Sequence, residues 1–283
     1  MNKTIQASNL VELKKQGEKL VCLTAYDFPT AKILDEAGID MILVGDSLAN
    51  VFLGLDNTYE IGMTEMLYHL RAVSRGVKRA LLAVDMPFLS YQVSIKEAVK
   101  NAAEFYRAGA QAVKLEGASE LTLEIVEKLT EIGIPVIGHL GYTPQSAGTI
   151  GKGKIQGKTD SSAKNIFEQA RKLEEAGAIT IVLEMIPADL ASQITKSLKI
   201  PTIGIGAGLD CDGQILVSDD IFGMTEKKLS FVKRYAEIGQ EMNRAAMDFA
   251  QEVDNSDPKA EVRTLKADLL RLGLHRPDAP TAK

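Results

Sequence analysis

The stretch Met41-Ile42-Leu43-Val44-Gly45-Asp46-Ser47 places a carboxylate and a hydroxyl directly after a short apolar run. Four consecutive apolar residues, with Ile and Val among them, are typical of a strand that is buried on both faces. In α/β proteins, ligands bind at the carboxyl ends of such strands. Asp46 is therefore a candidate functional residue, although a single Asp in this position more often only caps the next helix.

Polar side chains recur at the ends of the other predicted strands. Asp85, Glu116, His139 and Glu184 each follow an apolar run. Helix capping explains any one of them, but it explains the whole set poorly, because strands made of Val, Ile, Leu and Ala do not need acids at their ends for stability. Lys114 lies two residues before Glu116, so the two side chains point to the same face of their strand.

The alternation of strands and helices predicts the fold. The predicted helices end at glycines, which adopt the left-handed conformation without a Cβ clash. Eight strands that alternate with helices favour a closed (β/α)8 TIM barrel over an open doubly wound sheet, which is the alternative. The nucleotide signature of the open sheet, G-x-G-x-x-G, does not follow the first predicted strand. The predicted strands cover residues 20–24, 41–44, 80–84, 112–116, 135–139, 180–184, 202–205 and 215–217.

A single barrel domain is predicted for most of the chain. It covers residues 1–253 and includes a short N-terminal helix, and residues 254–283 form a C-terminal helical extension and tail. A helical run is predicted from about residue 228 to residue 252. Two connections, residues 48–63 and 141–158, exceed the usual length of a strand-to-helix turn and are candidate functional loops.

Composition excludes several classes of protein. The 283 residues are 45% hydrophobic and 25% charged, which is ordinary for a soluble globular protein. A formal net charge of −5 argues against a general nucleic-acid or anionic-membrane binder. The two cysteines are too few for a disulfide framework, and the N-terminus lacks an apolar signal core. We therefore expect a cytoplasmic protein with reduced thiols and small-molecule ligands.

The carboxylates Asp46, Asp85, Glu116 and Glu184 are expected at one mouth of the barrel, where they would repel one another without a cation. Oxygen ligands with one histidine and no paired cysteines suit a hard ion such as Mg²⁺ rather than Zn²⁺. Mg²⁺ leaves coordination positions for a 2-oxoacid, whose proton next to the carbonyl becomes acidic. Glu184, at the end of an apolar strand apart from the other acids, is the candidate base. Lys114 would neutralise the substrate carboxylate.

Seven segments of the chain resemble the ketopantoate hydroxymethyltransferase family. They lie in the order and at the spacing of that family, and together they cover roughly residues 10–250. A set of this kind is far more specific than one motif. The segments are LTAYD (23–27), VGDSL (44–48), VKLEG (113–117), GHLGYTPQS (138–146), LE (183–184), IGIGAG (203–208) and DGQILV (212–217).

The resemblance implies a (β/α)8 barrel of the phosphoenolpyruvate/pyruvate-type superfamily that assembles as a homodecamer. It also implies a transferase that moves a hydroxymethyl group from 5,10-methylenetetrahydrofolate to 3-methyl-2-oxobutanoate. The product would be 2-dehydropantoate (ketopantoate), formed through a Mg²⁺-stabilised enolate in the synthesis of pantothenate and coenzyme A.

Roles for single residues follow from the resemblance by position. Asp46 and Asp85 would ligate Mg²⁺, with Glu116 joining directly or through water. Glu184 would be the proton acceptor, which agrees with the role inferred above from its place on the strand. The implied substrate-binding residues are Asp46, Ser47, Asp85, Lys114 and His139.

Three short segments depart from the pattern of the family. The usual GGYKVQG is GKGKIQG at residues 151–157, PVT is EIG at residues 60–62, and a His-Asp pair is Asp219-Asp220. The predicted metal ligands and base lie outside these segments. A related Mg²⁺-dependent lyase, aldolase or mutase for another 2-oxoacid is therefore an alternative, and a non-catalytic scaffold is a third.

Overall fold

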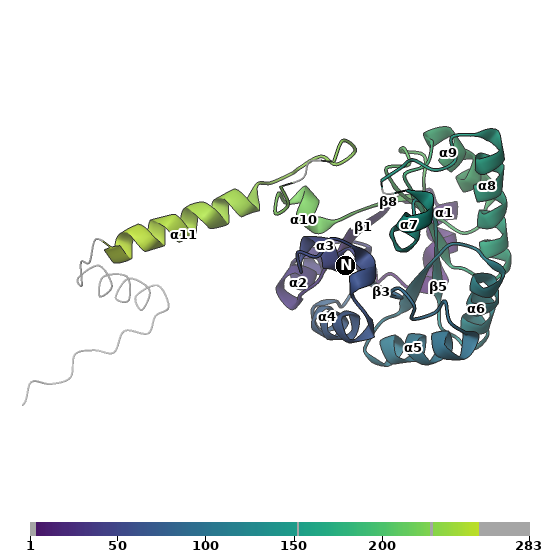
Figure 1. Ribbon diagram of the computed structural model, residues 1–283, viewed down its shortest axis with the longest axis horizontal. Helices are drawn as coiled ribbons and strands as arrows, with labels where there is room; N and C mark the ends of the chain where they lie inside the picture. The colour runs from purple at the N-terminus through teal and green to yellow at the C-terminus, as the bar shows by residue number, and fades with distance from the viewer. Residues whose placement is uncertain (1–3, 152, 227–228, 255–283) are drawn as a thin grey trace, which may run out of the picture.

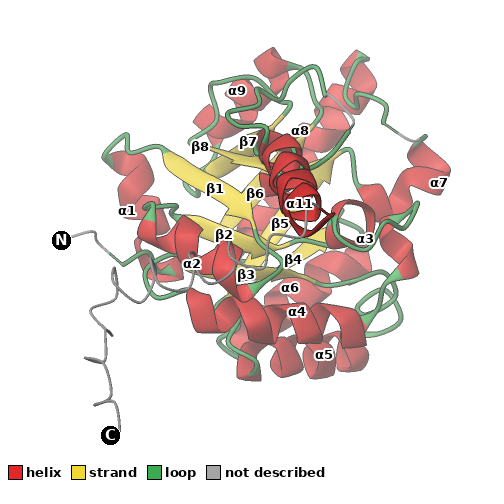
Figure 2. Cartoon of the chain, turned by 90° about the vertical axis from the view of Figure 1, so that its left-hand side faces the viewer, coloured by secondary structure: helices red, strands yellow, loops and turns green. Residues whose placement is uncertain are grey.

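The structure is a computed structural model that describes residues 4–151, 153–226 and 229–254. Its eight strands are all parallel and close into a barrel in sequence order, with β8 paired to β1. Figure 2 shows the strands enclosed by helices. The predicted TIM barrel is confirmed, and the open sheet is wrong. The strands are β1 (Leu20–Thr24), β2 (Met41–Val44), β3 (Leu81–Asp85), β4 (Ala112–Glu116), β5 (Val136–Gly141), β6 (Thr180–Glu184), β7 (Thr202–Ile205) and β8 (Gly213–Leu216).

Helices connect successive strands from β1 to β7 and form the outer layer of the barrel (Figure 1), whereas β8 follows β7 without a helix between them. Both long connections contain short helices, α3 and α7, instead of irregular chain alone. Within the described residues, no helix is both long and apolar enough to cross a membrane. The α-helices are α1 (Leu10–Lys15), α2 (Phe28–Glu36), α3 (Leu48–Val51), α4 (Met63–Gly76), α5 (Ile95–Arg107), α6 (Glu120–Glu131), α7 (Ala147–Ile150), α8 (Asp160–Glu175), α9 (Ala188–Ser197), α10 (Ser218–Ile221) and α11 (Ile238–Asp254). The 3-10 helices in the described part of the chain are η1 (Ala7–Asn9), η2 (Thr58–Glu60) and η3 (Pro144–Ser146).

The helix α5 shows how sequence produces this outer layer. Ser94 caps its first turn by accepting a hydrogen bond from the backbone of Glu97 (3.2 Å). Ala98, Ala102 and Phe105, spaced by four and three residues, lie on one face and are fully buried. Because every residue of β3 and β4 is buried, these strands need apolar cover outside the barrel as well as a packed interior.

The N-terminal helix α1 closes the end of the barrel at which the strands begin. Leu10 and Leu13 join an apolar cluster with inward-facing residues near the starts of the strands, among them Leu20, Met41 and Leu81. The opposite end, where the strands finish, is therefore the end left for ligands.

We expect Leu13→Ala to lower the free energy of unfolding by about 3 kcal/mol, because a buried leucine loses its transfer energy and leaves a cavity. Leu13 is 1% exposed, whereas Leu209 is 84% exposed and provides a matched control. Leu209→Ala should change the same free energy by less than about 0.5 kcal/mol. Chemical denaturation followed by circular dichroism measures both variants. Equal effects would show that α1 does not seal the barrel.

The chain after β7 differs from the prediction in two places. Strand β8 begins at Gly213 instead of residue 215, and the helical run predicted from about residue 228 begins only at Ile238. The preceding backbone bonds to α10 and the residue after it: Tyr235 N donates to Ile221 O (2.8 Å) and Ile238 N donates to Phe222 O (2.8 Å). These bonds use donors that an earlier helix start would need.

Helix α11 runs away from the barrel and buries none of its residues (Figure 1). One side of it is nonetheless apolar, with Ile238, Met242, Phe249 and Val253 between 41% and 69% exposed. Beyond Asp254, the predicted extension and tail lie outside the described residues, so the predicted division at residue 253 stays a prediction.

Candidate active site

Lys114 lies at the centre of a buried charged cluster at the carboxyl ends of β3, β4 and β5. The strand register sets Asp85 beside Lys114 and Glu116 beside His139. Lys114 Nζ is 3.1 Å from Asp85 Oδ1 and 3.1 Å from His139 Nδ1. The same His139 nitrogen is 3.3 Å from Glu116 Oε1. None of the four residues is more than 7% exposed.

Asp46 reaches this cluster from β2. Its backbone N donates to Asp85 Oδ2 (2.9 Å), and its own carboxylate is buried. Ser47 follows, but its hydroxyl lies 2.9 Å from the phenolic oxygen of Tyr26. A Cβ on Gly45 would lie 2.8 Å from Ser47 Oγ, so a larger residue there would displace the Ser47 hydroxyl. The predicted Ser47 is therefore beside the cluster and bonded to Tyr26.

Glu184 faces His139 from β6, with its Oε2 3.2 Å from His139 Nε2. Its side chain is 18% exposed, more than the other carboxylates of the cluster, so it has access to a ligand. The backbone around it is closely held. Tyr142 N donates to Glu184 O (2.8 Å), and a Cβ on Gly141 would lie 2.1 Å from that oxygen. Met185, the next residue, has a left-handed φ of 47°.

The charges of the cluster shift one another's pKa values. Burial raises the pKa of Asp85 to about 6, because Lys114 offsets only part of the lost solvation. Burial, with the charge of Glu116, also raises the pKa of Asp46. Burial opposes a charge on Lys114, yet the surrounding carboxylates raise its pKa. Burial and Lys114 likewise oppose protonation of His139, but its two carboxylate neighbours outweigh them and raise the pKa to about 9.

The residues of the cluster fit a hard cation. Four carboxylates face one ammonium and one imidazole, so negative charge is in excess. Asp85 Oδ1 and Glu116 Oε1 are buried, and within the described part of the chain their polar contacts are the ion pairs with Lys114 and His139 and no further hydrogen bond. No three His, Cys, Asp or Glu residues among those described are placed to hold one metal ion together. Mg²⁺ usually takes only one or two carboxylates and completes its shell with water and substrate oxygens.

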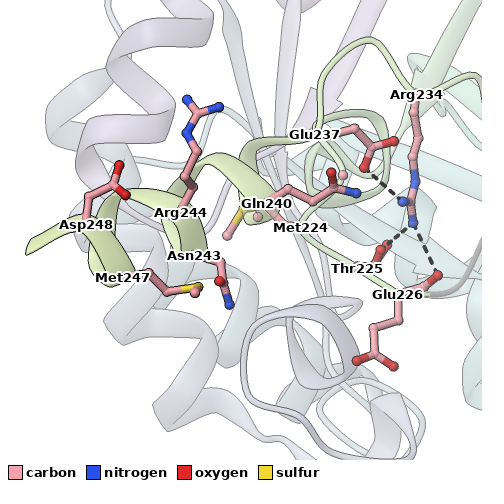
Figure 3. Close-up of a pocket in the computed structure, with 12 residues that line it drawn as sticks. Met224, Thr225, Glu226, Arg234, Glu237, Gln240, Asn243, Arg244, Met247 and Asp248 are labelled. Atoms are coloured by element: carbon pink, nitrogen blue, oxygen red, sulfur yellow. Dashed lines mark hydrogen bonds and ion pairs between the residues drawn. The ribbon is translucent and has the colours of Figure 1, made fainter. Parts of the chain in front are cut away.

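A cavity of about 530 Å³ lies elsewhere, at the base of α11 (Figure 3). Arg234 is fixed at its edge by Glu237 Oε2 (3.2 Å) and by the carbonyls of Thr225 and Glu226. None of the predicted site residues lines this cavity. The candidate active site is the Lys114 cluster, because the buried charges and the short distances between them are found there. The lining residues are Gly223, Met224, Thr225, Glu226, Arg234, Glu237, Gly239, Gln240, Asn243, Arg244, Met247 and Asp248.

Comparison with known proteins decides the family of this chain. The family model described as ketopantoate hydroxymethyltransferase matches residues 4–259. The chain belongs to that family. Among its relatives, the 3-methyl-2-oxobutanoate hydroxymethyltransferase of Syntrophus aciditrophicus is 51% identical over 89% of this chain and 93% of its own length. The protein of the same name from Syntrophobacter fumaroxidans is 54% identical over 85% and 86%.

Solved structures share the fold of this ketopantoate hydroxymethyltransferase family member at low sequence identity. A phosphonopyruvate hydrolase, solved with oxalate and Mg²⁺, has a TM-score of 0.59 and 16% identity over 95% of this chain and 98% of its own. A 2,3-dimethylmalate lyase of the PEP mutase/isocitrate lyase superfamily has a TM-score of 0.57 and 18% identity over 98% and 91%. At this identity, these likenesses show that the barrel fold is shared.

Two residues that hydrogen-bond to the cluster, Gln145 and Tyr91, are not among the site residues predicted from the sequence of this ketopantoate hydroxymethyltransferase family member. Gln145 donates to Asp46 and Glu116, and Tyr91 hydrogen-bonds to the backbone of Glu116. Gln145 lies in the GHLGYTPQS segment, which already carries the family resemblance. Tyr91 follows Pro87 in an irregular connection, and no sequence pattern singles it out.

Proposed function

We propose that this protein transfers a hydroxymethyl group from 5,10-methylenetetrahydrofolate to 3-methyl-2-oxobutanoate and thereby forms 2-dehydropantoate. The observation that carries the proposal is the buried cluster of acids around Lys114. It lies in a chain that is 51% identical in sequence to a protein named 3-methyl-2-oxobutanoate hydroxymethyltransferase. The cluster lies at the carboxyl ends of the strands, which is the end of a TIM barrel where ligands bind.

Each residue of the cluster would have a separate role in the hydroxymethyl transfer. Asp46 and Asp85 would hold Mg²⁺, with Glu116 joining directly or through water, and the bound ion would supply the positive charge that polarises the carbonyl of the oxoacid. Lys114 would hold the substrate carboxylate. Glu184 would remove the proton from C3 of the oxoacid, since its carboxylate is the least buried of the four and has no ammonium partner among the described residues.

Ser47 and His139 would complete the substrate pocket. His139 lies between Glu116 and Glu184, and in the metal-free protein these two carboxylates raise its pKa to about 9. A protonated imidazole here would hold the Glu184 carboxylate in place. Ser47, anchored by Tyr26, would contact the substrate carboxylate from the β2 side.

Thermal stabilisation by Mg²⁺ is expected to be larger near pH 8 than near pH 5.5, because carboxylates must be deprotonated to bind a cation. Burial raises the pKa of Asp85 from 3.8 to about 6, so a proton competes for it below that pH. In the metal-free protein, a rise in pH has the opposite effect on stability. The folded protein holds this proton more tightly than the unfolded chain, so Asp85 makes the metal-free protein less stable as pH rises from about 4 to about 6. Thermal scans with and without Mg²⁺ measure both trends, and a pH-independent Mg²⁺ effect would contradict the assignment.

Formation of 2-dehydropantoate from both substrates with saturating Mg²⁺ tests the proposed activity. No product from the folded protein under these conditions would overturn it. Proton exchange at C3 without a folate-dependent product would favour the related 2-oxoacid lyase, aldolase or mutase instead. Absence of both cation binding and exchange would favour the scaffold.

We also propose that the protein is a cytoplasmic homo-oligomer, a homodecamer as the family resemblance implies. The exposed apolar side of α11 supports self-association, because an isolated helix with such a side gains stability only by packing. Two buried free cysteines fit a reducing compartment. Light scattering should give a mass several times that of one chain, and a monomer in solution would contradict the proposal.

A further inference from the structure

Gln145, in the short helix η3, connects two of the carboxylates of the cluster. Its side-chain Nε2 donates to Asp46 Oδ2 (3.0 Å) and to Met86 O (2.9 Å). Its backbone N donates to Glu116 Oε2 (3.0 Å). Asp46 and Glu116 belong to the ends of β2 and β4, so one residue ties together acids that come from different strands.

The orientation of the Gln145 amide is fixed by its surroundings. Its Oε1 accepts from Gln92 Nε2 (2.9 Å) and from the phenol of Tyr91 (3.3 Å). The reversed amide would place Oε1 against the carboxylate of Asp46 and the carbonyl of Met86, neither of which can donate when Asp46 is ionised. The nitrogen must therefore face Asp46.

These bonds decide which carboxylate oxygens remain for a ligand. Gln145 occupies Oε2 of Glu116. The other oxygen, Oε1, lies 3.3 Å from His139 Nδ1 and has no hydrogen bond among the described residues. Asp46 is likewise held through Oδ2 alone. Gln145 thus holds each acid by one oxygen, and the like charges, which would otherwise move apart, are kept close.

We propose that Gln145 is a positioning residue that holds Asp46 and Glu116 in the arrangement needed to bind a divalent cation. The inference rests on the proposed function, in which these acids hold the cation. A side chain that hydrogen-bonds to metal-binding carboxylates sets their orientation, and its loss typically weakens metal binding by about 10- to 100-fold.

Calorimetric titration of the full-length protein with Mn²⁺ and with Mg²⁺, without substrate, tests the proposal. Gln145→Met keeps the length of the side chain but removes the amide. Asn101→Leu is the matched control, because Asn101 is an equally buried amide that donates to Ser90 O (2.7 Å) and to no carboxylate. We expect Gln145→Met to bind at least about tenfold more weakly than the parent, and Asn101→Leu to bind like the parent.

A purely structural role gives a different pattern. It would lower the melting temperature of both variants and leave cation affinity unchanged, or weaken it equally in both, and either result overturns the proposal. Excess Mg²⁺ should restore turnover of Gln145→Met to near the parent rate, whereas turnover that stays low at saturating metal counts against positioning. A parent protein that binds neither cation overturns the proposed function itself. If Gln145→Met does not fold, Gln145→Asn replaces it, since its shorter amide cannot reach both Asp46 Oδ2 and Met86 O.

Discussion

Replacing Glu184 with glutamine is expected to slow proton exchange at C3 of 3-methyl-2-oxobutanoate by at least about 100-fold, the lower range for loss of a positioned base. A carboxamide has nearly the same shape as a carboxylate but cannot accept the proton. The affinity for Mg²⁺ should stay within about twofold of the parent, because Glu184 contacts His139 and not the three proposed ligands.

Deuterium exchange followed by nuclear magnetic resonance measures this step without the folate substrate. It therefore separates proton removal from hydroxymethyl transfer, and it also distinguishes the proposed transferase from a protein that only binds the oxoacid. Glu175→Gln serves as the control, because that carboxylate is 68% exposed on α8 and pairs with Arg171. Exchange at the parent rate in Glu184→Gln would move the role of base to another residue.

The barrel could be predicted because its signal is local and repeated. Each short apolar run needs cover on both faces, and several of these runs follow a helix that ends at a glycine, as at Gly38 and Gly109, which both have a positive φ. The gathering of polar residues at one end then follows from topology alone, since all strands of a parallel barrel point the same way. No knowledge of contacts is needed for either step.

The finer structure of the site could not be predicted, because it depends on register and on connections. The pairing of Glu116 with His139 is set by how β4 and β5 align. Gln145 and Tyr91 reach the carboxylates from chain that is irregular or nearly so, where periodicity carries no information. The place of α11 is a similar case, because an amphipathic pattern predicts a helix but not the surface on which its apolar side packs.

Replacing Asp85 with alanine is expected to weaken Mg²⁺ binding by at least about 100-fold, equivalent to about 2.7 kcal/mol, and to abolish turnover at ordinary metal concentrations. Asp85 is 3% exposed, and both of its oxygens are engaged: Oδ2 accepts from Asp46 N (2.9 Å) and Oδ1 pairs with Lys114 (3.1 Å). Asp85→Ala removes a proposed ligand of the cation. It also removes the acceptor that holds the backbone N–H of Asp46 in place.

Asp85→Asn separates these two effects. The amide oxygen can still accept from Asp46 N, so the turn should persist while the charge is lost. Breaking a buried ion pair from one side costs about 3–5 kcal/mol, so thermal melting must first show that both variants are folded. If metal binding depends on the charge, Asp85→Asn should bind almost as poorly as Asp85→Ala, whereas Glu184→Gln should bind like the parent. Equal Mg²⁺ affinity in Asp85→Ala and the parent would refute this division of labour, because the acids around Lys114 would then neutralise that lysine alone.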